Sequence, residues 1–211
     1  MDEGLSLDRV QVRLNGRVLL SLDLAVAPGT VTSVMGPSGS GKSTLLGAVM
    51  GTLSAPFEVL GRIRLDGADL SGRPPEARGI GILFQDDLLF PHLSVGANLA
   101  FGLPPGLRGR AARRAAVDAA LSEIGMAGFA ARDPGSLSGG QKIRVALMRT
   151  LLSEPRALLL DEPFSSLDAD LRAQMRTMVF ARARARTLPV LMVTHDAEDA
   201  AAADGPVLRL G

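Results

Sequence analysis

The sequence has no cysteine, tyrosine or tryptophan, and its seven phenylalanines account for the whole 3% aromatic content. Without cysteine the chain cannot form a disulfide framework, a zinc–cysteine site or a thiol nucleophile, which fits a reducing compartment. Its 211 residues suffice to bury a substantial apolar core without covalent or metal cross-links. We therefore expect a single domain, or one core with a lobe inserted into it.

The sequence also lacks an excess of either charge, with 23 basic and 22 acidic residues. No strong overall field then attracts nucleic acid or anionic lipid, and we expect no nucleic-acid partner. No apolar stretch approaches the roughly 18 residues of a membrane span, and the acidic start lacks the features of a secretory signal, so we expect a soluble chain. Two residue types are rare: the only lysines are Lys42 and Lys142, and the only histidines are His92 and His195.

Four short apolar runs have the length and flanking residues of strands buried on both faces of a parallel sheet. They cover residues 31–35, 80–84, 157–160 and 190–193. A glycine-rich loop follows the first, and polar residues follow the others: Gln85, the pair Asp161 and Glu162, and the pair Thr194 and His195. Because ligands in open α/β sheets bind beyond the carboxyl ends of the strands, these residues predict one shared site.

The remaining segments predict two further kinds of structure. Residues 5–28 alternate apolar and polar side chains around Asn15-Gly16, which indicates antiparallel strands joined by a tight turn, and residues 63–65 add another strand. Residues 93–153 are rich in alanine and arginine and helical in pattern, with breaks at 104–106 and 133–135. We expect a core with a β subdomain at about 1–85 and 154–211, and a helical lobe at about 86–153.

The first strand is followed by a glycine-rich loop with the spacing of a phosphate-binding P-loop and by an apolar helical segment. Its backbone N–H groups and helix start would hold phosphate oxygens; the lysine would bridge the β- and γ-phosphates, and the first hydroxyl after it would ligate Mg²⁺. The phosphate-binding residues are Gly36, Pro37, Ser38, Gly39, Ser40, Gly41, Lys42, Ser43 and Thr44.

An acidic pair at the end of the third apolar run matches this loop. We expect Asp161 to hold the Mg²⁺ shell and Glu162 to polarise a water for attack on the γ-phosphate. An Asp-Glu pair is also common in solvated turns, but the buried strand before it and the P-loop favour the catalytic interpretation.

A second glycine-rich turn, residues 137–141, precedes a helix that we expect to run to about Leu152. Ser138 is a good N-cap, and Gly139 and Gly140 leave bare N–H groups at the helix start, before Gln141. One nucleotide needs only one phosphate cradle, so this helix start would address a nucleotide held by another subunit. A plain helix cap remains the alternative, because spacing alone does not exclude it.

Together these motifs resemble the ATP-binding cassette (ABC) ATPase family, in the family's order and over essentially the whole chain. The resemblance implies an α/β fold: a P-loop NTPase core with a parallel sheet, an N-terminal antiparallel β subdomain and an inserted helical lobe. It implies a homodimer whose two cassettes hold two ATP molecules, with Mg²⁺, head to tail between one P-loop and the other subunit's Ser138–Gln141. Gln85 would link the Mg²⁺ and water site to the helical lobe, Asp168 would lie at the dimer seam, and His195 would contact the γ-phosphate. We interpret His92 as structural.

Residues 84–95 resemble bacterial importer ATPases, among them compact members of the thiamine type and the Ynj type. That resemblance implies separate integral-membrane permease subunits, a solute-binding protein in the full complex, and a peripheral position on the cytoplasmic face of the inner membrane. We expect no appended regulatory domain. The candidates for a permease-binding groove are Leu88, Leu89, Phe90 and Phe101, although each could equally pack in the lobe's core.

Three alternatives stay open at this level: a soluble ABC ATPase acting on nucleic acid or ribosomes, an exporter ATPase, and a P-loop nucleotide kinase. Arg182, Arg184 and Arg186 are spaced i, i+2 and i+4 and do not form one helical face, which argues against a nucleic-acid surface, and a kinase leaves residues 137–141 and His195 unexplained. One position departs from the family: no aromatic residue occurs in 10–19, and Leu14 stands nearest to the usual adenine-stacking position. We therefore predict weaker discrimination among purine nucleotides.

Overall fold

The computed structural model describes residues 4–86 and 88–210. Asp87 of the importer-like stretch, the first three residues of the acidic start and Gly211 lie outside the described residues. The chain divides into two compact units. The first comprises Met1–Ile82, Arg156–Pro163 and Arg176–Gly211, and the second comprises Leu83–Pro155 and Phe164–Met175.

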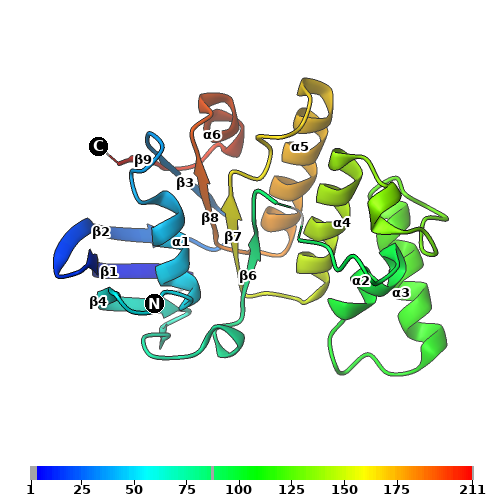
Figure 1. The fold of residues 1–211 in the computed structure, drawn as a ribbon, viewed down its shortest axis with the longest axis horizontal. Coiled ribbons are helices and arrows are strands. Elements are labelled where there is room, and N and C mark those ends of the chain that lie inside the picture. The colour runs from blue at the N-terminus through cyan, green and yellow to red at the C-terminus, as the bar shows by residue number, and fades with distance from the viewer. Residues whose placement is uncertain (1–3, 87, 211) are drawn as a thin grey trace. The chain divides into compact units, whose positions relative to one another are not determined.

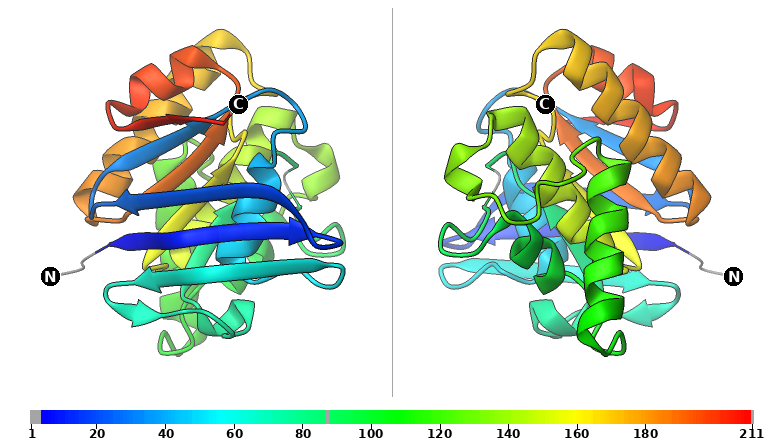
Figure 2. Two further views of the ribbon diagram at one scale, coloured as in Figure 1. Left: turned by 90° about the vertical axis from the view of Figure 1, so that its left-hand side faces the viewer. Right: turned by 90° about the vertical axis from the view of Figure 1, so that its right-hand side faces the viewer.

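The first unit contains an antiparallel sheet with strand order β2-β1-β4-β5. These strands are β1 (Leu5–Leu14), β2 (Arg17–Val26), β4 (Phe57–Leu65) and β5 (Ala68–Asp69). The predicted hairpin is confirmed, since Asn15 and Gly16 both take positive φ angles and join β1 to β2. The strand predicted at 63–65 is the end of the nine-residue β4. The left view of Figure 2 faces this sheet, with the first helix behind it.

The second sheet is parallel and has the order β6-β7-β8-β3-β9 (Figure 1). Its strands are β3 (Val31–Met35), β6 (Ile80–Leu83), β7 (Ala157–Asp161), β8 (Val190–Thr194) and β9 (Val207–Arg209). The four predicted strands are confirmed to within one residue. Every residue of β3 and β8 is buried, as continuous apolar runs in a parallel sheet require.

The helix α1 (Lys42–Met50) shares one core with residues from both sheets, through Leu45, Leu46 and Val49. It ends at Gly51, whose φ of 76° favours glycine. Beside this end lies the buried Arg78, after the 3₁₀ turn η1 (Pro75–Ala77). Its guanidinium donates hydrogen bonds to the carbonyls of Ala48 and Val49 and so supplies donors that the helix itself lacks.

Two further helices complete the first unit. They are α5 (Ala169–Ala185), which belongs to this unit from Arg176 onward, and α6 (Ala197–Ala203). Arg184 on α5 donates a hydrogen bond to the carbonyl of Ala203, the last residue of α6. This contact ties the C-terminal end of α6 to α5.

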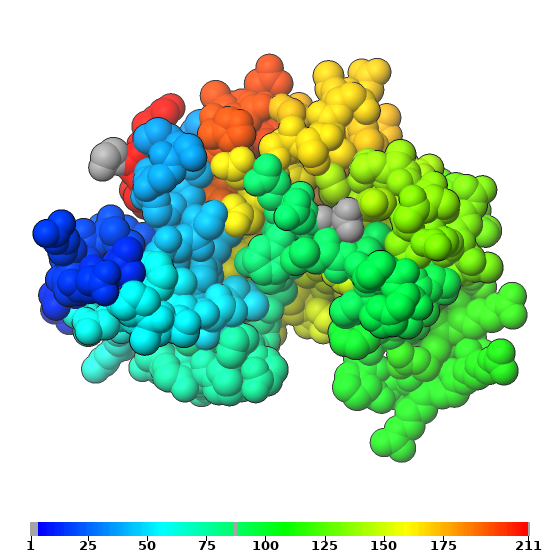
Figure 3. Space-filling model, viewed as in Figure 1, coloured from blue at the N-terminus to red at the C-terminus, as the bar shows by residue number. Residues whose placement is uncertain are grey.

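The second unit is helical, as predicted: α2 (Val95–Phe101), α3 (Arg110–Glu123), the 3₁₀ turn η2 (Pro134–Ser136) and α4 (Gly139–Leu152). Both predicted breaks fall between helices, and the loop before α3 projects from this unit in Figure 3. Arg113 holds that loop by donating to the carbonyls of Ala100 and Leu107. Across the described residues, no helix combines the length and the apolar character that crossing a membrane requires.

Candidate functional site

The P-loop closes around its own lysine. The Lys42 ammonium is 7% exposed and donates hydrogen bonds to the carbonyls of Gly36 (2.8 Å) and Pro37 (3.0 Å) at the start of the loop. Gly41 precedes α1 with a φ of 89°, a conformation that L side chains rarely adopt, and no side chain of the described residues caps this helix start. The first backbone N–H groups of α1 are therefore not used by a side-chain cap.

The hydroxyl and the carboxylate predicted to ligate a metal lie together. Ser43 Oγ is 3.4 Å from Asp161 Oδ1, although 118 residues separate them in the sequence. Burial at the end of β7 raises the pKa of Asp161, and the nearby Glu162 adds to the effect, while the Ser43 hydrogen bond and Lys42 oppose it. The site therefore destabilises the carboxylate until a cation or donor compensates its charge.

Glu162 lies between the side chains of Lys42 and His195, both of which are rare residue types in this chain. His195 Nδ1 is 3.0 Å from one Glu162 oxygen, and Lys42 Nζ is 3.9 Å from the other. Glu162 adopts a φ of 46°, and its N–H donates a hydrogen bond to the Val193 carbonyl, which joins the end of β7 to the neighbouring strand β8. The first unit thus brings together the P-loop, Asp161, Glu162 and His195, as the strand-end argument predicts.

Gln85, Ser138–Gln141 and Asp168 belong to the second unit. Gln85 is exposed just after β6, and Asp168 accepts a hydrogen bond from the Leu171 N–H at the start of α5. His92 is exposed, and its ring lies 6.1 Å from that of Phe90.

The second glycine-rich turn forms a complete capping box. The Ser138 hydroxyl accepts from the Gln141 N–H, and the Gln141 side chain accepts from the Ser138 N–H. A Cβ atom on Gly140 would come within 2.1 Å of a Leu171 methyl, whereas one on Gly139 would meet nothing within 4 Å. Gly140 therefore packs closely against Leu171 of α5, a contact that the sequence pattern does not reveal because the two residues are 31 positions apart.

The four apolar residues predicted as a permease groove differ in exposure. Leu88 and Phe101 are 54% and 69% exposed, whereas Leu89 is buried. Phe90 is half-buried: its ring contacts Phe101 edge-on at 4.8 Å, and the Arg149 guanidinium lies 5.0 Å over it. Only Leu88 and Phe101 expose a large apolar surface, and Leu89 belongs to the core.

Comparisons with known proteins agree with this geometry. Residues 19–165 match the model of the family described as ABC transporter. The chain is 47% identical to the uncharacterized ABC transporter ATP-binding protein YnjD of Escherichia coli (strain K12), over 98% of this chain and 94% of that protein. It is similar to thiamine import ATP-binding proteins ThiQ: 47% identical to that of Cereibacter sphaeroides over 93% of this chain and 83% of the relative, and 43% identical to that of E. coli K12 over 86% and 77%.

The family model covers both the P-loop and Asp161-Glu162, and the YnjD and ThiQ matches cover most of each chain. The parallel sheet, the separate antiparallel sheet and the helices are the fold that the sequence predicts for this family. The chain therefore belongs to the ABC transporter family and is an ATP-binding ATPase of that family.

Proposed function

We propose that this ATPase energises solute import through separate integral-membrane permease subunits, as a peripheral subunit on the cytoplasmic face of the inner membrane. ATP hydrolysis is supported by one observation: the side chains of Lys42 and His195 both lie within 4 Å of the Glu162 carboxylate. The import part is supported by the ThiQ relatives, whose name is thiamine import ATP-binding protein. A solute-binding protein would complete such a system.

The phosphate cradle in this proposal consists of residues Gly36–Thr44. Without a side-chain cap, the N–H groups at the start of α1 are available to phosphate oxygens, and the helix dipole favours negative charge there. The γ-phosphate would replace the Gly36 and Pro37 carbonyls as a partner of Lys42. In this proposal the Lys42 ammonium would bridge the β- and γ-phosphates.

The residues present fit a Mg²⁺ ion. Ser43 and Asp161 supply adjacent oxygens, and burial raises the pKa of Asp161, so a bound cation would compensate the charge of its carboxylate. No group of three or more candidate metal-binding side chains occurs in the described residues, which suits a cation that Mg-nucleotide sites hold through one or two protein ligands plus phosphates. Bound there, Mg²⁺ would neutralise charge on the phosphate oxygens; Gln85 would contribute from the second unit.

In the hydrolytic step, Glu162 acts as general base. It takes a proton from the water whose oxygen bonds to the γ-phosphorus, while the bond from that phosphorus to the β–γ bridging oxygen breaks and ADP leaves. Lys42 and His195 both contact the Glu162 carboxylate. A bound γ-phosphate would contact Lys42 and His195, and the Glu162 carboxylate would then orient the attacking water.

We further propose that two copies of the chain act as a head-to-tail pair. The start of α4, with its capping box and the open position at Gly139, would contact the phosphate of the nucleotide held by the partner's P-loop. Asp168 would lie at the seam between the copies. Leu88 and Phe101 would contact the permease, because they are the exposed members of the apolar group after Gln85.

A mixing experiment tests the paired site. Lys42→Ala disables one copy's P-loop and Ser138→Arg blocks the other copy's α4 start, so neither variant alone should release phosphate from Mg-ATP. Mixed, they form dimers with one site built from two unaltered halves, and about half of the wild-type activity per such dimer should return. A mixture as inactive as its components would place Ser138 and the P-loop of one chain in the same site and contradict the pairing.

The transport part needs its own measurement. The full chain, tagged and extracted from its own cells' membranes in detergent, should retain an integral-membrane subunit with the hydropathy of a permease. Recovery of the chain with ribosomes or nucleic acid instead would replace import with the soluble alternative.

A further inference from the structure

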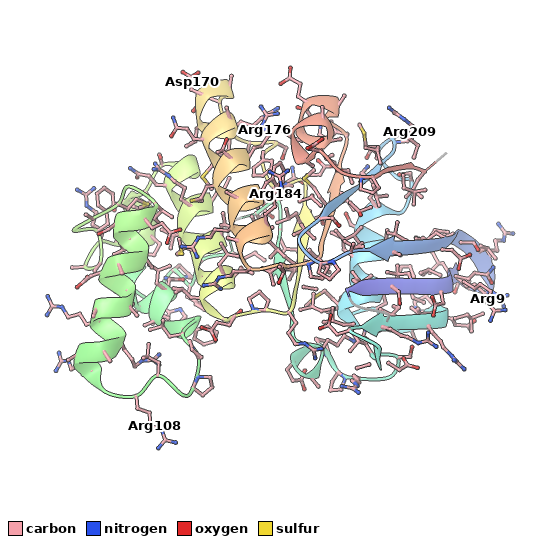
Figure 4. The ribbon with its side chains drawn as sticks, turned by 180° about the vertical axis from the view of Figure 1, so that it is seen from behind. Arg9, Arg108, Asp170, Arg176, Arg184 and Arg209 are labelled. Atoms are coloured by element: carbon pink, nitrogen blue, oxygen red, sulfur yellow. The ribbon has the colours of Figure 1, made fainter. Side chains whose placement is uncertain are left out.

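Beyond the roles assigned above, the structure holds a largely buried ion pair whose carboxylate, Asp199, lies four residues after His195 in the sequence. Asp199, on α6, is 2% exposed, and its Oδ1 lies 3.3 Å from an Arg176 guanidinium nitrogen on α5. Arg176 is itself only 13% exposed, and Figure 4 shows it on α5 beside α6. Two charges removed from water are costly unless they are well paired, so this pair holds α5 and α6 in one arrangement.

The pair connects to the segment that carries His195 through Thr194. The Thr194 hydroxyl is 1% exposed, donates to Asp199 Oδ2 over 3.5 Å and accepts from the Asp196 N–H at 3.0 Å. His195 therefore lies between Thr194, whose hydroxyl donates to the buried carboxylate, and Asp196, whose N–H donates to that hydroxyl. The imidazole itself is 60% exposed, so its own packing does little to fix it.

A neighbouring carboxylate offers an internal comparison. Glu198 Oε2 lies 3.8 Å from the same arginine, but its side chain is 79% exposed. Exposed pairs at this distance contribute little because water and salt screen them. The positional effect should thus come from Asp199 and not from the second acidic residue.

We propose that Asp199 and Arg176 are positioning residues that hold His195 at the distance from Glu162 needed for hydrolysis. This inference rests on the proposed function of His195. It also connects α5 to the His195 segment, because Arg176, the eighth residue of that helix, pairs with Asp199.

The first test is spectroscopic and independent of ATP hydrolysis. The chain has only two histidines, so imidazole proton–carbon NMR signals can be assigned with His195→Ala. Asp199→Asn should shift the His195 signal and leave that of His92 in place, while Glu198→Gln should move neither. An unmoved His195 signal in folded Asp199→Asn would overturn the positioning role.

The second test is kinetic. Asp199→Asn should lower kcat for ATP by roughly tenfold to a hundredfold, the usual loss for a misplaced catalytic group, with KM changed less than about twofold. In a His195→Ala background the same substitution should cost nothing more, because residues acting through one group are not additive. An equal loss in both backgrounds would mean general destabilisation and would overturn the inference alone.

Two further variants, His195→Ala and Arg176→Lys, serve as controls. Full activity of His195→Ala would overturn the proposed role of His195 and this inference with it, an outcome distinct from the equal-loss result. Should Asp199→Asn fail to fold, Arg176→Lys keeps the charge but loses the planar guanidinium, and is expected to show the same signal shift and a smaller loss of kcat. Wild-type spectra and kinetics for Arg176→Lys would contradict the proposal.

Discussion

Two helices of this protein begin at glycine-rich turns, and the two starts are built differently. α4 starts with a capping box in which Ser138 and Gln141 satisfy one another's backbone N–H groups. α1 starts after Gly41, has no side-chain cap among the described residues, and instead has a buried lysine folded across its loop. Glycine-rich helix starts are therefore not equivalent anion sites. The N–H groups at the start of α1 have no side-chain cap in the part of the chain that the structure describes and are left for a ligand, whereas some of those at the start of α4 are already bonded by side chains of the same turn.

The largest expected effect comes from replacing each of the two lysines in turn, because Lys42 lies at the start of α1 and Lys142 near the start of α4. Lys42→Ala should lower kcat for ATP by at least about a hundredfold, the usual loss when one donor to developing charge is removed. Lys142→Ala, next to the capping box of α4, should retain activity within about twofold. Phosphate release at saturating Mg-ATP measures both, and comparable losses would remove the distinction between the two starts.

A smaller effect is expected on the stability of α4. Ser138→Ala removes the hydroxyl that accepts the Gln141 N–H and should lower the free energy of unfolding by about 1 kcal/mol. Ser138→Thr, which keeps the acceptor, should lose less. Urea denaturation followed by far-UV circular dichroism gives both values; an unchanged midpoint for the alanine variant would show that the cap contributes nothing in solution.

A carboxylate beside the start of α1 gives a pH-dependent effect. Because burial raises the pKa of Asp161, this group supports folding at acid pH, and that support is lost as the pH rises through the raised pKa. The Asp161→Asn variant has no carboxyl group to deprotonate and so does not lose this stability. In EDTA, its thermal midpoint should exceed that of the wild type at pH 7, and the gap should shrink toward pH 4. A gap that is constant with pH would mean that the charge is not the cause.

The smallest effect concerns the base end of the nucleotide. Leu14 is paired across the sheet with Phe57, at the end of β1. Leu14→Tyr should raise ATP affinity about twofold to tenfold, as aromatic stacking adds about 0.5–1.5 kcal/mol, while the wild type hydrolyses ATP and GTP about equally. Equilibrium binding of fluorescent ATP and GTP analogues measures the gain. A sharp ATP preference in the wild type would show that leucine already discriminates.

Most of the fold was predictable because its signals are local. Four apolar runs, one Asn-Gly turn and the prolines at 104–105 and 134 mark their elements within the stretch of chain that forms them. The P-loop and the acidic pair were predictable because strand ends in a parallel sheet meet at one edge. The 3.4 Å approach of Ser43 and Asp161 follows from that rule and not from their sequence separation.

The contacts that were missed depend on partners far away in the sequence. Nothing near Gly140 predicts that Leu171 packs against it, and nothing near Asp199 predicts that Arg176 pairs with it. The sequence also does not predict which of Leu88 and Leu89 is buried, because both are leucines, yet Leu88 is exposed and Leu89 is buried. Such contacts are set by tertiary packing, which periodicity does not encode.

The far end of α1 constrains how this protein can change over generations. A Cβ on Gly51 would come within 2.4 Å of the Arg78 guanidinium, which donates to the last carbonyls of the helix. A side chain at position 51, already strained by a φ of 76°, is thus blocked for as long as the arginine keeps its length. Shortening Arg78 first removes the block but leaves the helix carbonyls without a donor. Either substitution made first is therefore unfavourable: at Gly51 because of the positive φ and the close guanidinium, and at Arg78 because of the lost hydrogen bonds.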